Sequence, residues 1–172
     1  FFLCLSNLMY HLNPADIMLE VTRYGATIGS IGGFAIGIVL IWTKTVIKPS
    51  DIALLMFLWG VSFFCGLRIG WQIFAFDTSS HIFSRGMVVG MTIGGTIGGY
   101  FTALLLQHYK LLNDWLNILL VTLGWLIALF FGSSFIFCFN FVGVPIGFIF
   151  AVIISGFIIG TVGSSIMFWQ MK

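Results

Sequence analysis

Residues 25–37 read GATIGSIGGFAIG, and residues 86–98 read GMVVGMTIGGTIG. In each stretch a glycine recurs at every fourth position. Because four residues advance an α-helix by about 400°, such glycines share one slowly drifting face. A face without side chains is a groove that lets another helix backbone approach closely, which is how helices associate in a membrane. The glycines with this spacing are Gly25, Gly29, Gly33, Gly37, Gly86, Gly90, Gly94 and Gly98.

The same spacing returns near the end of the chain, at Gly156 and Gly160. We therefore expect glycine-zipper (GxxxG) packing. Two interpretations of the grooves stay open. They pack the first predicted helix on the third inside the protein, or one of them receives a partner subunit, a lipid or a pigment tail. Neighbouring small residues widen the faces or offer hydrogen bonds across them: Gly32, Gly95, Gly99, Thr27, Ser30, Thr92 and Thr96.

The composition places these helices in a bilayer. Of 172 residues, 60% are hydrophobic and only 7% are charged, against about 25% charged residues in a soluble domain. This excludes a water-soluble globule and a disordered chain, and three widely spaced cysteines exclude a disulfide framework. A net charge of +2 is too small for nucleic-acid binding. The sequence predicts an all-α integral membrane protein surrounded by lipids.

Apolar runs long enough to span a bilayer predict a single domain, a bundle of about five transmembrane helices. Two of them follow a proline and an acid that suit a first helical turn, at Pro14 with Asp16 and at Pro49 with Asp51. Segment 1–12 is apolar but too short to span, and we interpret it as the tail of a truncated helix, with an interfacial segment or a processed terminus as alternatives. The expected helices are 21–42, 51–74, 86–107, 114–139 and 142–170.

The two glycine stretches also suggest a repeat. The segment from Gly25 to Gly29 resembles the segment from Gly90 to Gly94, 65 residues later, and Trp59-Gly60 loosely matches Gly124-Trp125. Each unit would be a glycine-rich helix followed by an aromatic one. Two spans per unit place the copies parallel to each other, unlike the inverted repeats of many transporters.

Ionisable chemistry is scarce within the predicted spans. All five acids lie at or beyond helix ends, and no histidine lies at mid-span, so we expect no catalytic residues, no metal site and no cofactor other than a bound lipid or pigment. Arg68 is the one charged residue well inside an apolar run. Its stem can reach the headgroups, or its guanidinium contacts a ligand or partner.

These features predict a non-catalytic membrane subunit that packs by glycine-rich faces among other transmembrane subunits. One alternative is a small channel or carrier for a neutral or hydrophobic solute. The other is the membrane-anchor fragment of a longer chain.

Overall fold

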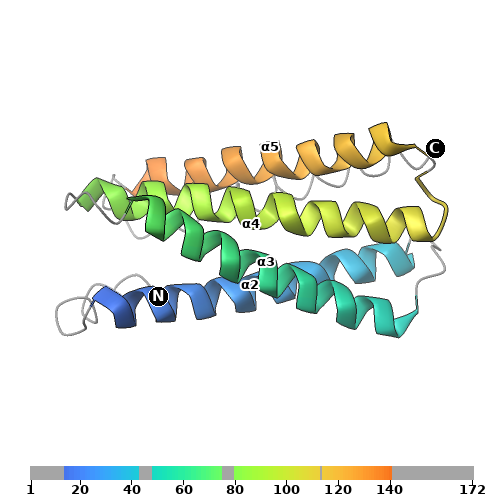
Figure 1. Cartoon of the computed structure of the whole chain (residues 1–172), viewed down its shortest axis with the longest axis horizontal. Helices are drawn as coiled ribbons and strands as arrows, with labels where there is room; N and C mark the ends of the chain where they lie inside the picture. Colours follow the sequence, from blue (N-terminus) through green and yellow to red (C-terminus); the bar gives the residue numbers. More distant parts are fainter. Residues whose placement is uncertain (1–13, 43–47, 75–79, 113, 141–172) are drawn as a thin grey trace.

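The computed structural model describes residues 14–42, 48–74, 80–112 and 114–140, which form four long α-helices (Figure 1). They are α2 (Pro14–Trp42), α3 (Pro49–Phe74), α4 (Ser80–His108) and α5 (Trp115–Asn140). Each is long and apolar enough to cross a membrane, and successive helices run antiparallel. The chain is therefore a multi-pass integral membrane protein. The predicted fifth helix 142–170, with Gly156 and Gly160, and segment 1–12 lie outside the described residues.

α2, α3 and α4 start before the predicted positions because turns outside the apolar run remain helical, whereas α5 starts at Trp115, one residue after the predicted position. α4 begins at Ser80 rather than at Gly86, although its apolar part runs from Arg85 to His108. At the start of α3, the Lys48 backbone N–H donates to Asp51 Oδ2 at 3.0 Å, and the Asp51 N–H donates to the Lys48 carbonyl at 2.9 Å. This reciprocal cap satisfies backbone groups that a helix start leaves unpaired.

The four helices form an open row in which each packs on its neighbours in the chain. α3 packs on both α2 and α4, α5 packs on α4, and α2 barely touches α4. The predicted packing of the first helix on the third is therefore wrong. Gly25, Gly29, Gly33 and Gly37 of α2 and Gly90, Gly94 and Gly98 of α4 all face α3, since short connections make consecutive helices spatial neighbours.

Large side chains from α3 and α5 form the core of this row. Trp59 is 3% exposed and its ring packs edge-on against Trp125, with ring centroids 5.0 Å apart. Phe63 stacks on Trp59 at 5.9 Å. Around these rings lie buried aliphatic residues from all four helices, among them Leu40, Leu55, Leu106 and Leu129.

Candidate functional site

Three large residues of α3, four positions apart, lie between the glycine faces of α2 and α4. We call Trp59, Phe63 and Leu67 the central ridge. All three side chains are buried. The residues of α2 and α4 that face them are glycines, which add no side chains to the contact. Their spacing keeps them on one side of α3, and the glycines opposite provide the space they fill.

On the α2 side, the backbones approach within contact distance. A Cβ atom added to Gly29 would lie 2.6 Å from the Trp59 carbonyl oxygen, and one added to Gly33 would lie 2.6 Å from the Leu55 carbonyl oxygen. Both separations are well below the contact optimum of about 3.5 Å. At Gly25 and Gly37 the nearest atoms instead belong to the Leu67 and Ile52 side chains.

On the α4 side, the approach is equally close. Added Cβ atoms would lie 2.7 Å from Leu67 Cα at Gly90, 2.8 Å from Phe63 Cα at Gly94, and 2.7 Å from Trp59 Cδ2 at Gly98. Gly86 contributes a carbonyl oxygen that faces Gly70 of α3.

The contacts follow the 65-residue offset of the sequence repeat. Gly25 and Gly90 both meet Leu67, and Gly29 and Gly94 both meet Phe63. α2 and α4 run parallel to each other on the two sides of α3 (Figure 1). Two pairs of equivalent glycines therefore contact the same ridge residue, whereas Gly33 and Gly98, at the same offset, meet Leu55 and Trp59.

Gly95 and Gly99 differ from the prediction that they widen the same face. They point to α5, where a Cβ atom added to Gly99 would lie 2.6 Å from Trp125 Cβ, and Gly95 meets the Leu129 side chain. One position is about 100° around a helix, so a step of one residue turns a glycine to a different neighbour. α4 thus has two glycine faces.

One side-chain hydrogen bond joins α3 to α4 in the core. Trp59 Nε1 donates to Thr102 Oγ1 at 2.9 Å, and the Thr102 hydroxyl donates to the Gly98 carbonyl at 3.0 Å. This pair was not among the expectations from the sequence. The available signal was the depth of Trp59, because tryptophans in membrane proteins gather at the interfaces. Trp125 Nε1 is buried and has no acceptor within the described residues.

The predicted hydrogen bonds of threonines across the glycine faces are not formed. Thr27 donates to the Arg23 carbonyl at 3.1 Å, Thr92 to the Val88 carbonyl at 2.8 Å, and Thr96 to the Thr92 carbonyl at 2.7 Å. Each hydroxyl is satisfied within its own helix, which is the ordinary arrangement for a threonine in a transmembrane helix.

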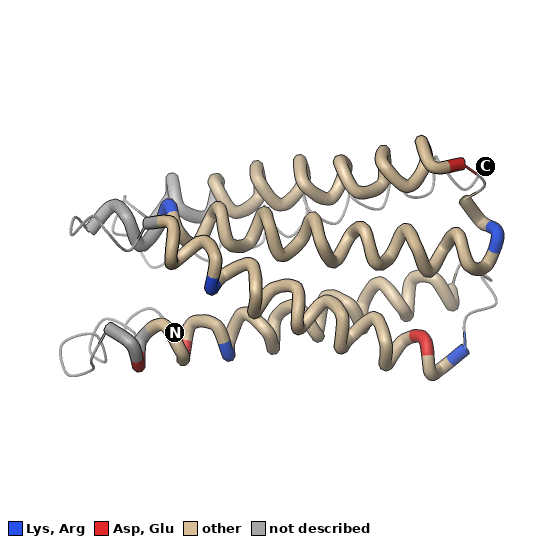
Figure 2. Tube along the Cα trace, viewed as in Figure 1, with Lys and Arg blue, Asp and Glu red and all other residues tan. Residues whose placement is uncertain are grey.

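Charged residues gather at the two ends of the helices (Figure 2). Arg68 is exposed and lies near the end of α3, which antiparallel packing brings to the same end of the row as the starts of α2 and α4, with Arg23 and Arg85. Arg23 Nη1 lies 3.1 Å from Glu20 Oε1. Within the four described ranges, no three His, Cys, Asp or Glu side chains come together as a metal site would need.

The opposite end holds a polar cluster. The Tyr109 hydroxyl donates to Asp51 Oδ2, which also accepts the Lys48 backbone N–H. This bond to a carboxylate raises the pKa of Tyr109, because the bond needs the protonated phenol. The His108 ring packs edge-on against Tyr109, with centroids 5.5 Å apart. The cluster ties the start of α3 to the turn after α4.

No known family, curated protein or solved structure matches the chain. Mid-membrane positions in the described helices carry close backbone contacts and a hydrogen-bonded tryptophan, whereas the Lys, Arg, Asp and Glu side chains lie toward the helix ends.

Proposed function

We propose that this chain is a non-catalytic subunit of a larger membrane complex, in which glycine-zipper contacts hold its own helices together and outer helix faces bind other transmembrane subunits. The observation that supports this most is the distribution of chemistry. Close packing fills the middle of the described helices, and their Lys, Arg, Asp and Glu residues lie near the ends. Such a chain offers surfaces to partners rather than reacting groups to a substrate.

The outer face of α2 is the surface that we propose for a partner. α2 packs on α3 along one side, and a row of large apolar residues on its other side is exposed. Lipid can cover such a face, but so can another helix, since lipid and helix offer similar apolar surroundings. The row consists of Ile28, Ile31, Phe34, Ile38 and Ile41.

Gentle solubilisation of native membranes, native-gel sizing and mass spectrometry of co-migrating chains test the proposal. We expect migration in a complex much larger than the 19.1 kDa chain. A photo-crosslinking amino acid at exposed Ile31 should capture a second subunit, and the same probe at buried Leu40 should react within the chain.

Migration as a monomer with no crosslink from Ile31 would contradict the proposal. Flux of a neutral solute through proteoliposomes of that monomer would then favour the carrier. An intact mass above 19.1 kDa for the native product would favour the membrane anchor of a longer chain.

A further inference from the structure

α3 and α4 diverge toward one end, and a cleft opens between them. Where the helices meet, glycines bring their backbones together, as at Gly66 with Gly90 and Gly94. Farther along, leucines and Phe101 replace the glycines and hold the helices apart. The resulting cavity has a volume of about 360 Å³, which is within the range of small-molecule sites.

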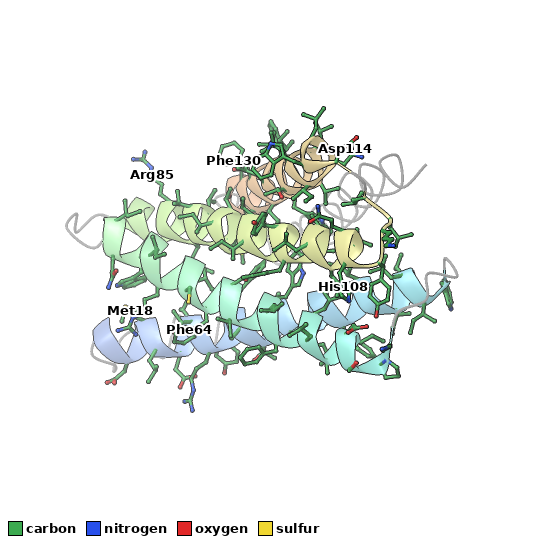
Figure 3. The ribbon with its side chains drawn as sticks, turned by 45° about the vertical axis from the view of Figure 1, so that its right-hand side comes forward. Met18, Phe64, Arg85, His108, Asp114 and Phe130 are labelled. Atoms are coloured by element: carbon green, nitrogen blue, oxygen red, sulfur yellow. The ribbon has the colours of Figure 1, made fainter. Side chains whose placement is uncertain are left out.

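The residues of each helix that line the cleft have the same helical spacing, at positions i, i+3, i+4 and i+7. α3 contributes residues from Asp51 to Leu58, and α4 contributes residues from Phe101 to His108. Asp51 and His108 lie at the outer ends of this pattern, and Figure 3 shows His108 at the end of α4. Seven residues at 1.5 Å each place the apolar floor about 10 Å deeper along the helices.

The Asp51 carboxylate and the His108 ring line the mouth of the cleft, and two lysines lie close to them in the chain. Asp51 uses Oδ2 for its two described hydrogen bonds. Exposed Lys48 precedes α3, and exposed Lys110 follows His108 by two residues. A ligand that fits this mouth has an apolar tail, a cation that can donate to a carboxylate, and an anion that lysine and histidine can contact.

We propose that the cleft binds one phospholipid whose headgroup carries a primary ammonium group beside its phosphate. An acyl chain lies between the leucines, the ammonium donates to the Asp51 carboxylate, and the phosphate lies near Lys48, Lys110 and His108. A choline headgroup has no N–H to donate, and a phosphoglycerol headgroup has no cation to pair with the Asp51 carboxylate. This site exists whether or not the chain belongs to a complex.

Native mass spectrometry of the purified full chain, with phosphatidylethanolamine, phosphatidylcholine and phosphatidylglycerol supplied in equal amounts, tests the proposal. We expect one tightly bound phosphatidylethanolamine, about tenfold preferred over either competitor, as one charge-assisted hydrogen bond would give. Asp51→Asn should remove this preference. Tyr109→Phe breaks the bond to Asp51 without changing the lining of the cleft, and the preference should remain.

Leu54→Trp should fill the cleft and abolish tight binding of all three lipids. Leu123→Trp, on similarly exposed α5 surface, is its matched control and should change nothing. Helical circular dichroism of each variant separates lost binding from lost folding. Equal binding of the three lipids, or binding unaffected by Leu54→Trp in a folded variant, would overturn the proposal and indicate ordinary annular lipid. Equal loss of preference in Asp51→Asn and Tyr109→Phe would overturn the role of Asp51 as headgroup acceptor.

Discussion

Trp59 of α3 contacts residues of both α4 and α5. It is 3% exposed, whereas Trp42 and Trp115, at helix ends, are 84% and 68% exposed. Its ring fills the space beside Gly98 and packs against Trp125 and Phe63. An indole N–H at this depth needs an acceptor, since no water is available to it, and Thr102 supplies one.

Thr102→Val should therefore cost about 1–2 kcal/mol of stability, because it leaves the Trp59 N–H unpaired in the core. Unfolding of the reconstituted chain by a denaturing detergent measures the loss. Thr96→Val is the matched control on the same helix, since the Thr96 hydroxyl bonds its own backbone. Equal losses in the two variants would show that the Trp59 bond contributes nothing specific.

The hydrogen bond of Tyr109 should make the stability of the fold fall at alkaline pH. Its pKa is raised from 10.0 because the hydroxyl donates to Asp51, so folding favours the protonated phenol. The contribution of this hydrogen bond to folding stability is complete below the ordinary tyrosine pKa, and it is lost as the pH rises through the raised pKa of Tyr109 in the folded state. The stability difference between the wild-type chain and Tyr109→Phe should therefore shrink from about pH 8 to about pH 11. Thermal unfolding of both proteins across this range measures it, and a constant difference would contradict the bond.

At the scale of the helix, alanine substitutions at two adjacent glycines of α2 should have opposite effects on stability. A Cβ atom added to Gly33 would lie 2.6 Å from the Leu55 carbonyl oxygen, whereas the nearest atom to one added to Gly32 is Trp59 Cε3, at 4.0 Å. Gly33→Ala should thus destabilise the fold by about 1–3 kcal/mol through overpacking. Gly32→Ala should be neutral or stabilise it by up to about 1 kcal/mol through helix propensity. Detergent-induced unfolding of both variants tests this, and a shared sign would refute the assigned helix face.

α4 is followed by a residue in the left-handed conformation that is not a glycine. Lys110 has φ of 57°, its N–H donates to the Gln107 carbonyl at 2.8 Å, and the Leu111 N–H donates to the Leu106 carbonyl at 2.9 Å. This is a Schellman motif, which usually has glycine at the position of Lys110.

Lys110→Gly should stabilise the fold by about 1 kcal/mol, because glycine adopts this conformation without the cost of a Cβ atom. Lys110→Ala removes the same charge but keeps the Cβ atom, so its stability should stay near that of the wild type. Thermal unfolding distinguishes them. A gain in both variants would assign the effect to charge rather than to backbone strain.

The four described helices were predictable because hydropathy and helix-start residues determine where a span lies. The far ends of α2 and α3, at Trp42 and Phe74, agree with the prediction. Pairing was not predictable, because glycine spacing identifies a face but not the helix that it meets. Gly94 and Gly95 differ by one position, yet one contacts α3 and the other α5. The Asp51–Tyr109 bond joins residues 58 positions apart and has no local signal.

At the scale of the whole molecule, α3 is the helix that packs on both α2 and α4 and couples their positions. The two glycine helices barely touch each other, and both press on one ridge of α3. A displacement of α3 that relieves crowding on one side increases it on the other. Changes in α2 and α4 should therefore be coupled although the helices are not in direct contact along most of their length.

Gly29→Ala and Gly94→Ala provide the test, since both added methyl groups press on Phe63, at 3.0 Å from Cβ and 2.8 Å from Cα respectively. Neither change can be accommodated by moving α3 once the other is present. Their combined cost should exceed the sum of the single costs by about 0.5–3 kcal/mol in a double-mutant cycle. Gly37→Ala with Gly95→Ala is the control pair, because these methyl groups meet Ile52 and Leu129, which share no helix. The control pair should be additive within about 0.5 kcal/mol. If the costs of Gly29→Ala and Gly94→Ala add, α3 adjusts to α2 and to α4 independently. Its central ridge then does not couple the two glycine helices.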